Sequence, residues 1–148
     1  MKGFWSCLLL GFTIISFAQE AKLVFPSGHL NGVINAEFSP DGKYVATGGF
    51  DNTLKIWETS TGKLVSTLKH ESYVRLIKFS PEGKYIVTDG GSEGAVIWEL
   101  STSNLKTELK GHKREISAID FSPDGKTIVT SSGDGTAKLW DSQSGKSL

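Results

Sequence analysis

The stretch Phe38-Ser39-Pro40-Asp41-Gly42-Lys43 recurs twice in this chain, first as Phe79-Ser80-Pro81-Glu82-Gly83-Lys84 and then as Phe121-Ser122-Pro123-Asp124-Gly125-Lys126. The copies are separated by 41 and 42 residues, and the tryptophans at 57, 98 and 140 and the histidines at 29, 70 and 112 keep the same two steps. A period of this length indicates structural units that stack on one another. The sequence therefore predicts three copies of one unit.

Within each unit the short-range pattern is typical of β-strands. Short runs of mixed apolar and polar residues flank each Ser-Pro-Asp/Glu-Gly turn, in which proline fixes φ and glycine is free to take a positive φ. The first unit predicts strands at 33–38, 44–47, 54–57 and 64–68, and the later units repeat them at 74–79, 85–88 and 95–98, and at 116–121, 127–130 and 137–140. No long amphipathic helical pattern interrupts them. The predicted fold is all-β, with one small four-stranded antiparallel sheet per unit.

Composition narrows the class of protein. The 148 residues include 16 basic and 16 acidic side chains, a formal net charge of zero, 17 glycines and a single cysteine. A protein that binds nucleic acid through bulk charge needs a basic surplus, so no nucleic-acid partner is predicted. One cysteine excludes a disulfide framework and a cysteine-based zinc site. The glycine excess agrees with a fold that contains many tight turns.

The N-terminal segment has the order of a secretory signal peptide. Lys2 precedes an apolar run over residues 4–17, and Ser16 and Ala18 form a small-x-small pair. This order predicts a signal peptide over residues 1–18, cleaved after Ala18 and followed by a secreted or periplasmic chain with no membrane association. A retained membrane anchor is the alternative, although the run is shorter than the roughly 20 apolar residues that a spanning helix needs.

These repeats resemble the WD40 family. The resemblance rests on Gly28-His29 and Gly111-His112, on the three Phe-Ser-Pro turns, and on Trp57-Glu58, Trp98-Glu99 and the literal Trp140-Asp141 pair. The second unit departs from the pattern at Lys69-His70, where no glycine precedes the histidine. The resemblance implies blades of a β-propeller: an outer strand at 19–27, repeats at 28–69 and 70–110, and a truncated repeat at 111–148. Propellers have about 4–8 blades, so we expect an incomplete ring. It is either the N-terminal part of a longer propeller or a piece that closes by self-association.

The resemblance also implies a hydrogen-bonded network of histidine, hydroxyl, aspartate and tryptophan inside each blade. The first and third units supply all four members and the second supplies three, with Ser92 at the position of the aspartate. Because buried polar networks are stable only when every member is paired, the second blade is predicted to be the weakest of the three. The network residues are His29, Thr47, Asp51, Trp57, His70, Thr88, Trp98, His112, Thr130, Asp134 and Trp140.

Partner contacts are implied on the wider face of the propeller. Aromatic residues and arginine dominate binding energy at protein interfaces, which favours Phe50, Tyr73 and Arg75. Phe50 and Tyr73 either contact the partner or pack on neighbouring loops. The predicted binding positions are Ile34, Phe50, Tyr73, Arg75, Glu115 and Ser117, with glycines at 32, 91 and 133.

No catalytic residue, metal site or cofactor is predicted. A hydrolytic triad occurs once beside an oxyanion hole, whereas here the histidine and hydroxyl recur at a fixed period and the hydroxyl belongs to a strand threonine. The predicted function is a non-catalytic protein–protein interaction scaffold with a protein or peptide partner. The alternative is the propeller portion of a larger secreted enzyme or receptor, whose catalytic or signalling domain lies outside this chain.

Overall fold

The computed structural model describes residues 28–148 apart from residues 90, 92 and 93. This part of the chain consists of strands and turns and contains no helix, as the all-β prediction requires. The predicted signal peptide at 1–18 and the predicted outer strand at 19–27 lie outside the described residues, and so does Ser92.

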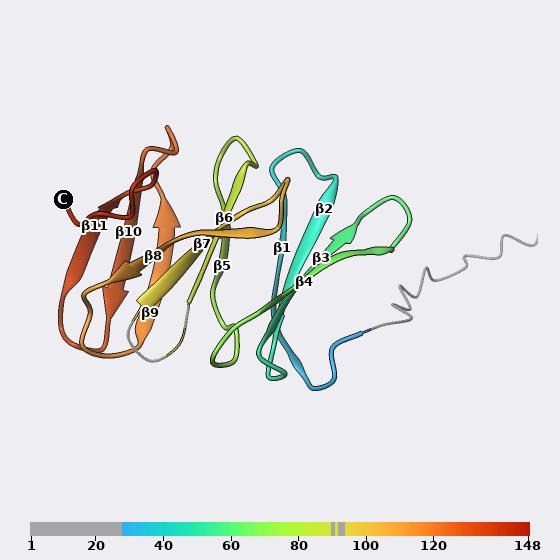
Figure 1. Cartoon of the computed structure of the whole chain (residues 1–148), viewed down its shortest axis with the longest axis horizontal. Coiled ribbons are helices and arrows are strands. Elements are labelled where there is room, and N and C mark those ends of the chain that lie inside the picture. Colours follow the sequence, from blue (N-terminus) through green and yellow to red (C-terminus); the bar gives the residue numbers. More distant parts are fainter. Residues whose placement is uncertain (1–27, 90, 92–93) are drawn as a thin grey trace, which may run out of the picture.

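The strands form three separate antiparallel sheets that lie side by side in chain order (Figure 1). We call them blades 1, 2 and 3. Blades 1 and 2 have four strands each in sequential order, and blade 3 has three, with Ser147 joined to Trp140 by an isolated bridge beyond β11. The strands of blade 1 are β1 (Val33–Phe38), β2 (Tyr44–Gly49), β3 (Thr53–Glu58) and β4 (Leu64–Lys69); those of blade 2 are β5 (Ile77–Phe79), β6 (Tyr85–Asp89), β7 (Gly94–Glu99) and β8 (Asn104–Lys110); those of blade 3 are β9 (Ile116–Phe121), β10 (Thr127–Ser132) and β11 (Ala137–Asp141).

The predicted strand at 74–79 is shorter than expected, because β5 begins only at Ile77. The backbone amides of Arg75 and Leu76 donate to the Asp89 carboxylate, over 2.9 Å and 3.0 Å to Oδ1. These amides are therefore held by a side chain instead of a neighbouring strand. The repeat pattern predicted a strand at 74–76 by analogy with the other two units. It could not show that Asp89, at the end of β6, binds these amides instead.

The apolar core lies between the blades. One buried cluster joins blades 1 and 2 and includes Leu54, Ile56 and Ile86, and a second joins blades 2 and 3 and includes Val87 and Ile97. Successive residues of a strand point to opposite faces, so Ile86 and Val87 of β6 belong to different clusters. Blade 2 is consequently buried on both faces.

Within the part of the chain that the structure describes, blades 1 and 3 each leave one face uncovered. Phe38 is 64% exposed, whereas its repeat equivalents Phe79 and Phe121 are 6% and 9% exposed. On the opposite side of the stack Leu139 is 50% exposed, while Ile97 at the same repeat position is fully buried. Each apolar blade face is thus buried only where a neighbouring blade covers it, and the three blades form an open arc, as predicted.

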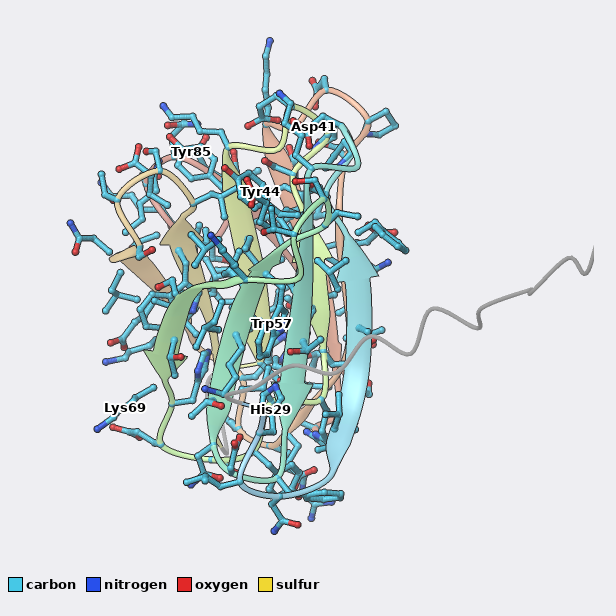
Figure 2. All side chains as sticks on the ribbon, turned by 90° about the vertical axis from the view of Figure 1, so that its right-hand side faces the viewer. His29, Asp41, Tyr44, Trp57, Lys69 and Tyr85 are labelled. Carbon is cyan, nitrogen blue, oxygen red and sulfur yellow. The ribbon has the colours of Figure 1, made fainter. Side chains whose placement is uncertain are left out.

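The Ser-Pro-Asp-Gly turns lie at one end of the blades, which Figure 2 marks with Asp41, and the histidine loops lie near the other end. In the first turn the Asp41 carboxylate accepts a hydrogen bond from the Ser39 hydroxyl, 2.7 Å away, and one from the Lys43 amide. The Ser39 bond is the main reason why the pKa of Asp41 falls to about 2. Gly42 has a φ of 69°, a conformation that glycine adopts without strain. We call the opposite end, with its histidine loops, the lower face.

Candidate functional site

A buried hydrogen-bonded network links the lower face to the body of blade 1. The Trp57 indole Nε1 donates to the Thr47 hydroxyl over 2.8 Å, and that hydroxyl lies 2.8 Å from His29 Nε2. His29 Nδ1 lies 2.8 Å from the Asp51 carboxylate. Since a neutral imidazole has one donor and one acceptor nitrogen, the arrangement is satisfied when Nδ1 donates to Asp51 and Nε2 accepts from Thr47.

Blade 3 repeats this geometry. The Trp140 indole to Thr130 distance is 2.8 Å, the Thr130 to His112 distance is 2.8 Å, and the His112 to Asp134 distance is 2.9 Å. The aspartate also accepts from the amide after the histidine, which is Lys113. Both loops of the lower face are therefore tied together in each of these blades.

The electrostatics of the two aspartates follow from these contacts. Burial by itself would raise the pKa of Asp51, but hydrogen bonds from His29 and Thr53 outweigh it and lower that pKa to about 2. A hydrogen bond from Thr136, followed by that of the Lys113 amide, holds the pKa of Asp134 well below its usual range. Both groups are carboxylates at neutral pH.

Blade 2 has a looser network. The Trp98 indole lies 3.3 Å from the Thr88 hydroxyl and 3.3 Å from His70 Nε2, so its single proton is shared between two acceptors. His70 Nδ1 lies 3.3 Å from the Leu68 carbonyl, which takes the part that an aspartate plays in the other blades. Burial lowers the pKa of His70, which favours the neutral ring.

Asp89 is a candidate site residue that the repeat pattern did not reveal. Its side chain is 2% exposed, and besides the two amides at the start of β5 it accepts from Arg75 Nε over 3.0 Å. Its repeat equivalents are Gly48 and Ser131, so no shared motif marks it. One feature of the sequence could have revealed it: only the second unit has an acidic residue at this position, directly after the apolar residues of a predicted strand.

Arg75 connects blade 2 to blade 3. Besides Asp89, its guanidinium donates to Glu115 Oε2 over 2.8 Å and to the Ile116 carbonyl over 3.2 Å. Burial would lower the pKa of Arg75, yet the bonds to Asp89 and Glu115 raise it. The guanidinium is thus a fixed part of the lower face.

The predicted binding residues fall into two groups. Phe50 and Tyr73 are 55% and 38% exposed, and their ring centroids are 5.8 Å apart. The Arg75 guanidinium lies 5.5 Å from the Tyr73 ring, and Glu115 follows it, so these four residues form a strip across all three blades. Ile34 and Ser117 lie outside the strip, Ile34 half-buried in β1 and Ser117 paired with Ser131 in blade 3.

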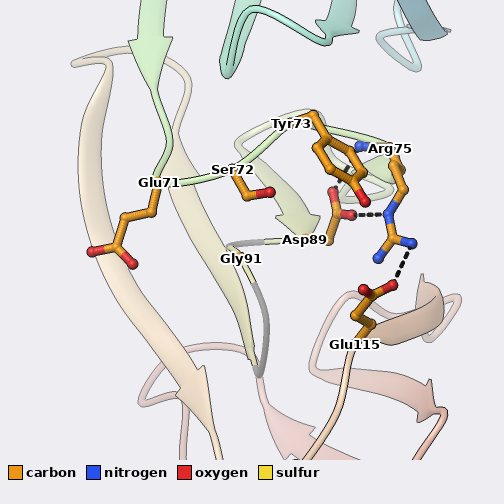
Figure 3. Close-up of a pocket in the computed structure, with 7 residues that line it drawn as sticks. All are labelled: Glu71, Ser72, Tyr73, Arg75, Asp89, Gly91 and Glu115. Atoms are coloured by element: carbon orange, nitrogen blue, oxygen red, sulfur yellow. Dashed lines mark hydrogen bonds and ion pairs between the residues drawn. The ribbon is translucent and has the colours of Figure 1, made fainter.

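A pocket of about 280 Å³ opens beside this strip (Figure 3). Its lining is mostly polar and comes from the segment before β5, from the end of β6 and from the start of blade 3. Within the described residues, no group of three or more His, Cys, Asp or Glu side chains is placed to hold a metal ion. No helix in the described ranges is long and apolar enough to cross a membrane. The lining residues are Glu71, Ser72, Tyr73, Arg75, Asp89, Gly91 and Glu115.

The comparisons with known proteins agree with this architecture. A family model described as WD domain, G-beta repeat matches residues 20–58, 62–99 and 103–141, which make up most of the chain. The chain belongs to the WD40 family. WD40 propellers are generally non-catalytic scaffolds that bind protein partners, which agrees with the coarse functional class predicted from the repeats.

Solved WD40 structures share the fold. The crystal structure of RRP9 WD40 repeats has a TM-score of 0.78 with 20% sequence identity, over 82% of this chain and 39% of that chain. The structure of U3-55K gives the same values. At this identity the likeness shows the fold alone.

Curated WD40 relatives match over short stretches. Periodic tryptophan protein 2 homolog of Mus musculus is 32% identical over 71 residues, which are 45% of this chain and 8% of that protein. Ribosome assembly protein 4 of Saccharomyces cerevisiae is 44% identical over 41 residues, 28% of this chain and 8% of that protein. Eukaryotic translation initiation factor 3 subunit I of Phaeosphaeria nodorum is 40% identical over 48 residues, 32% of this chain and 14% of that protein. This WD40 chain therefore spans a small fraction of the relatives it matches.

The relatives overturn the predicted location. Their names place them in ribosome assembly and translation initiation, which take place inside the cell. The prediction of a secreted or periplasmic protein is therefore wrong, and no relative supports a signal peptide at residues 1–18. The order of a basic residue, an apolar run and a small-x-small pair predicts export, but it carries no information about the processes in which the relatives take part. The alternative of a larger enzyme or receptor loses its secreted location and otherwise stays a prediction.

Proposed function

We propose that this WD40 chain is a non-catalytic scaffold that binds a protein partner through its lower face. The observation that carries the proposal is the strip of Phe50, Tyr73, Arg75 and Glu115, which runs across three blades. Two aromatic rings are exposed there beside a guanidinium that is already fixed in place. Aromatic side chains with little freedom to lose supply large contact area at low entropic cost.

A protein partner is favoured over a nucleic acid. Phosphate recognition needs a surplus of free cations, whereas the arginine of this strip is committed to Asp89 and Glu115. Exposed aromatic rings next to a rigid polar group are typical of the anchor residues in protein interfaces. We place this role in a multi-protein assembly, because relatives of the chain are named as a ribosome assembly protein and as a translation initiation factor subunit.

The histidine networks support a structural role instead of catalysis. In blades 1 and 3 the threonine hydroxyl lies between an indole N–H and an imidazole nitrogen, both 2.8 Å away. Such a hydroxyl donates its only proton within the network. The imidazole beside it could accept that proton, but the hydroxyl also accepts from the indole and is buried, Thr130 being 0% and Thr47 8% exposed, so it is not placed to attack a substrate as a nucleophile.

Site-specific photocrosslinking in the native host tests the proposal. A benzophenone amino acid at position 50 is compared with the same group at Val65, which is equally exposed at 55% but lies in β4. We expect a discrete protein adduct from position 50, no such adduct from position 65, and loss of the adduct when Tyr73→Ala is added. Adducts from position 65 alone, or a position 50 adduct to nucleic acid, would contradict the proposal.

A further inference from the structure

The pocket beside Tyr73 contains more negative than positive charge. Three carboxylates line it, those of Glu71, Asp89 and Glu115, against the single guanidinium of Arg75. Asp89 is buried, and its two oxygens already accept two amides and Arg75 Nε. The Asp89 charge is therefore balanced by Arg75, and its side chain is only 2% exposed to a ligand.

Glu71 and Glu115 supply the charge that remains. Glu115 is 60% exposed at its side chain and binds Arg75 through one oxygen, Oε2, so its second oxygen is open to solvent. No hydrogen bond or salt bridge joins Glu71 to another residue of the described ranges. Lys110 attracts Glu71 at longer range but is itself paired with Glu108. Two carboxylates thus flank the pocket without a full countercharge.

The pocket already shows how a cation is held there. In Figure 3 Glu71 and Glu115 lie on opposite sides of the opening, with Tyr73 and Arg75 along one edge. The Arg75 guanidinium is bound by a carboxylate and a carbonyl and lies 5.5 Å from the Tyr73 ring. Attraction between a cation and an aromatic face adds to such carboxylate contacts. A second cation entering the pocket from solvent would meet the Ser72 hydroxyl or the second oxygen of Glu115, and the Glu71 carboxylate, which points away from Glu115 in Figure 3, would attract it at longer range.

An apolar contact adjoins this opening. Phe50 packs beside Tyr73 on the side toward blade 1, and more than half of its surface is exposed. A partner segment that reaches the pocket with one side chain would therefore place a neighbouring side chain on Phe50. The strip therefore offers an apolar contact at Phe50 and Tyr73 and, next to it, a negatively charged pocket.

We propose that the pocket binds a lysine or arginine side chain of the partner protein, and that Phe50 and Tyr73 bind an apolar residue beside it. The inference rests on the proposed function and adds the chemistry of the partner. A nucleic acid is disfavoured at this point, because its phosphates would face Glu71 and Glu115.

Short peptides test the charge preference directly. The probes are acetyl-Gly-Leu-Arg-Gly-Gly-amide and the same peptide with norleucine or glutamate in place of arginine, titrated into the ¹⁵N-labelled full chain. We expect the arginine peptide to shift the amides of Tyr73 and Glu115 and to bind several-fold more tightly than the norleucine peptide. Its affinity should fall as salt is raised, because exposed charges are screened. The glutamate peptide should bind least.

Charge-removing variants make the test specific to the pocket. Because one exposed ion pair contributes up to a few-fold in affinity, Glu71→Gln should weaken the arginine peptide about threefold and leave the norleucine peptide unchanged. Glu82→Gln, an exposed acid in the turn at the opposite end, is the matched control and should change neither affinity. Far-UV circular dichroism verifies that both variants are folded.

Each contrary result has a definite meaning. Equal binding of the three peptides at Phe50 and Tyr73 would overturn the cation preference and leave the proposed face in place. Binding of an octameric oligouridine at the Glu115 amide, displaced by no peptide, would overturn the inference in favour of RNA. Absence of all peptide binding would overturn it too, and the crosslink from position 50 would then show separately whether the proposed function survives.

Discussion

Arg75 Nε donates to Asp89 Oδ2 across 3.0 Å, and through this contact an arginine in front of β5 is fixed to the end of β6. The same guanidinium reaches Glu115 and the Ile116 carbonyl of blade 3. Asp89 therefore fixes the segment before β5 and, through Arg75, also stabilises the junction between blades 2 and 3. The contact explains how a repeat without the usual network aspartate keeps its loop in place.

Replacing Asp89 should destabilise the chain more than an ordinary surface change. We expect Asp89→Ser, which introduces the residue found at the equivalent position 131, to lower the free energy of unfolding by about 2 kcal/mol, because a charged acceptor of three hydrogen bonds is lost. Urea denaturation followed by tryptophan fluorescence measures the change. In the Arg75→Met background the same substitution should have a smaller effect, since the cation is no longer left unpaired. Additive losses would show that the two side chains are not coupled.

Gly48 occupies the same repeat position as Asp89, but there it allows the backbone of blade 2 to approach closely. A Cβ atom placed on it would lie 2.4 Å from the Val74 carbonyl oxygen of blade 2, far inside van der Waals contact. We expect Gly48→Ala to lower the free energy of unfolding by about 1–3 kcal/mol, as overpacking of a close contact does. Gly133→Ala is the control, because its Cβ would meet nothing nearer than 3.8 Å. Equal midpoints of urea denaturation for the two variants would refute the close approach of blades 1 and 2.

The repeat period predicted what all three units share. It placed strands such as Tyr44–Gly49 and Thr53–Glu58 nearly at their observed bounds, because alternation and turn residues act over a few positions of the chain. The four strip residues were also among the predicted positions, although only the three-dimensional arrangement shows that Phe50, Tyr73, Arg75 and Glu115 follow one another across blades.

Features that belong to one unit only could not be predicted from the repeat period. Position 48 is glycine and lies against Val74 of the next repeat, position 89 is aspartate and binds Arg75 of its own repeat, and position 131 is serine and pairs with Ser117. The burial of Phe79 and the exposure of Phe38 likewise depend on whether a blade precedes them. Such differences arise from tertiary contacts, and a local sequence pattern contains no information about those contacts.

Because the network of blade 2 is looser, replacing its threonine by valine should cost less stability than the same substitution in blade 3. Thr130→Val should lower the free energy of unfolding by about 2 kcal/mol, because the buried Trp140 indole and His112 imidazole would both lose a partner that now lies 2.8 Å away. Thr88→Val should lower it by about half as much, since the Trp98 indole lies 3.3 Å from Thr88 and is also 3.3 Å from His70. Both variants are measured by urea denaturation under the same conditions. Equal losses would contradict the prediction that the network of the second blade is the weakest.

Acid should destabilise the chain through its network aspartates. Burial opposes ionisation of Asp51, but hydrogen bonds from His29 and Thr53 lower its folded pKa to about 2, against about 3.9 in the unfolded chain. A group with a lowered folded pKa stabilises the fold above its unfolded pKa, and that stabilisation is lost as the pH falls through the folded pKa. The loss is therefore expected between about pH 4 and pH 2.

Asp51→Asn isolates this contribution. The variant should be less stable than the natural chain at pH 7, and the difference between their urea midpoints should shrink as the pH is lowered from 4 toward 2, because the natural carboxylate is then being protonated. Asp134 and Asp41, whose pKa values are also lowered, remain in both proteins, so neither profile becomes flat. Adding Asp134→Asn should flatten the profile further. Parallel profiles for the natural chain and Asp51→Asn would show that this carboxylate does not link the stability of blade 1 to pH.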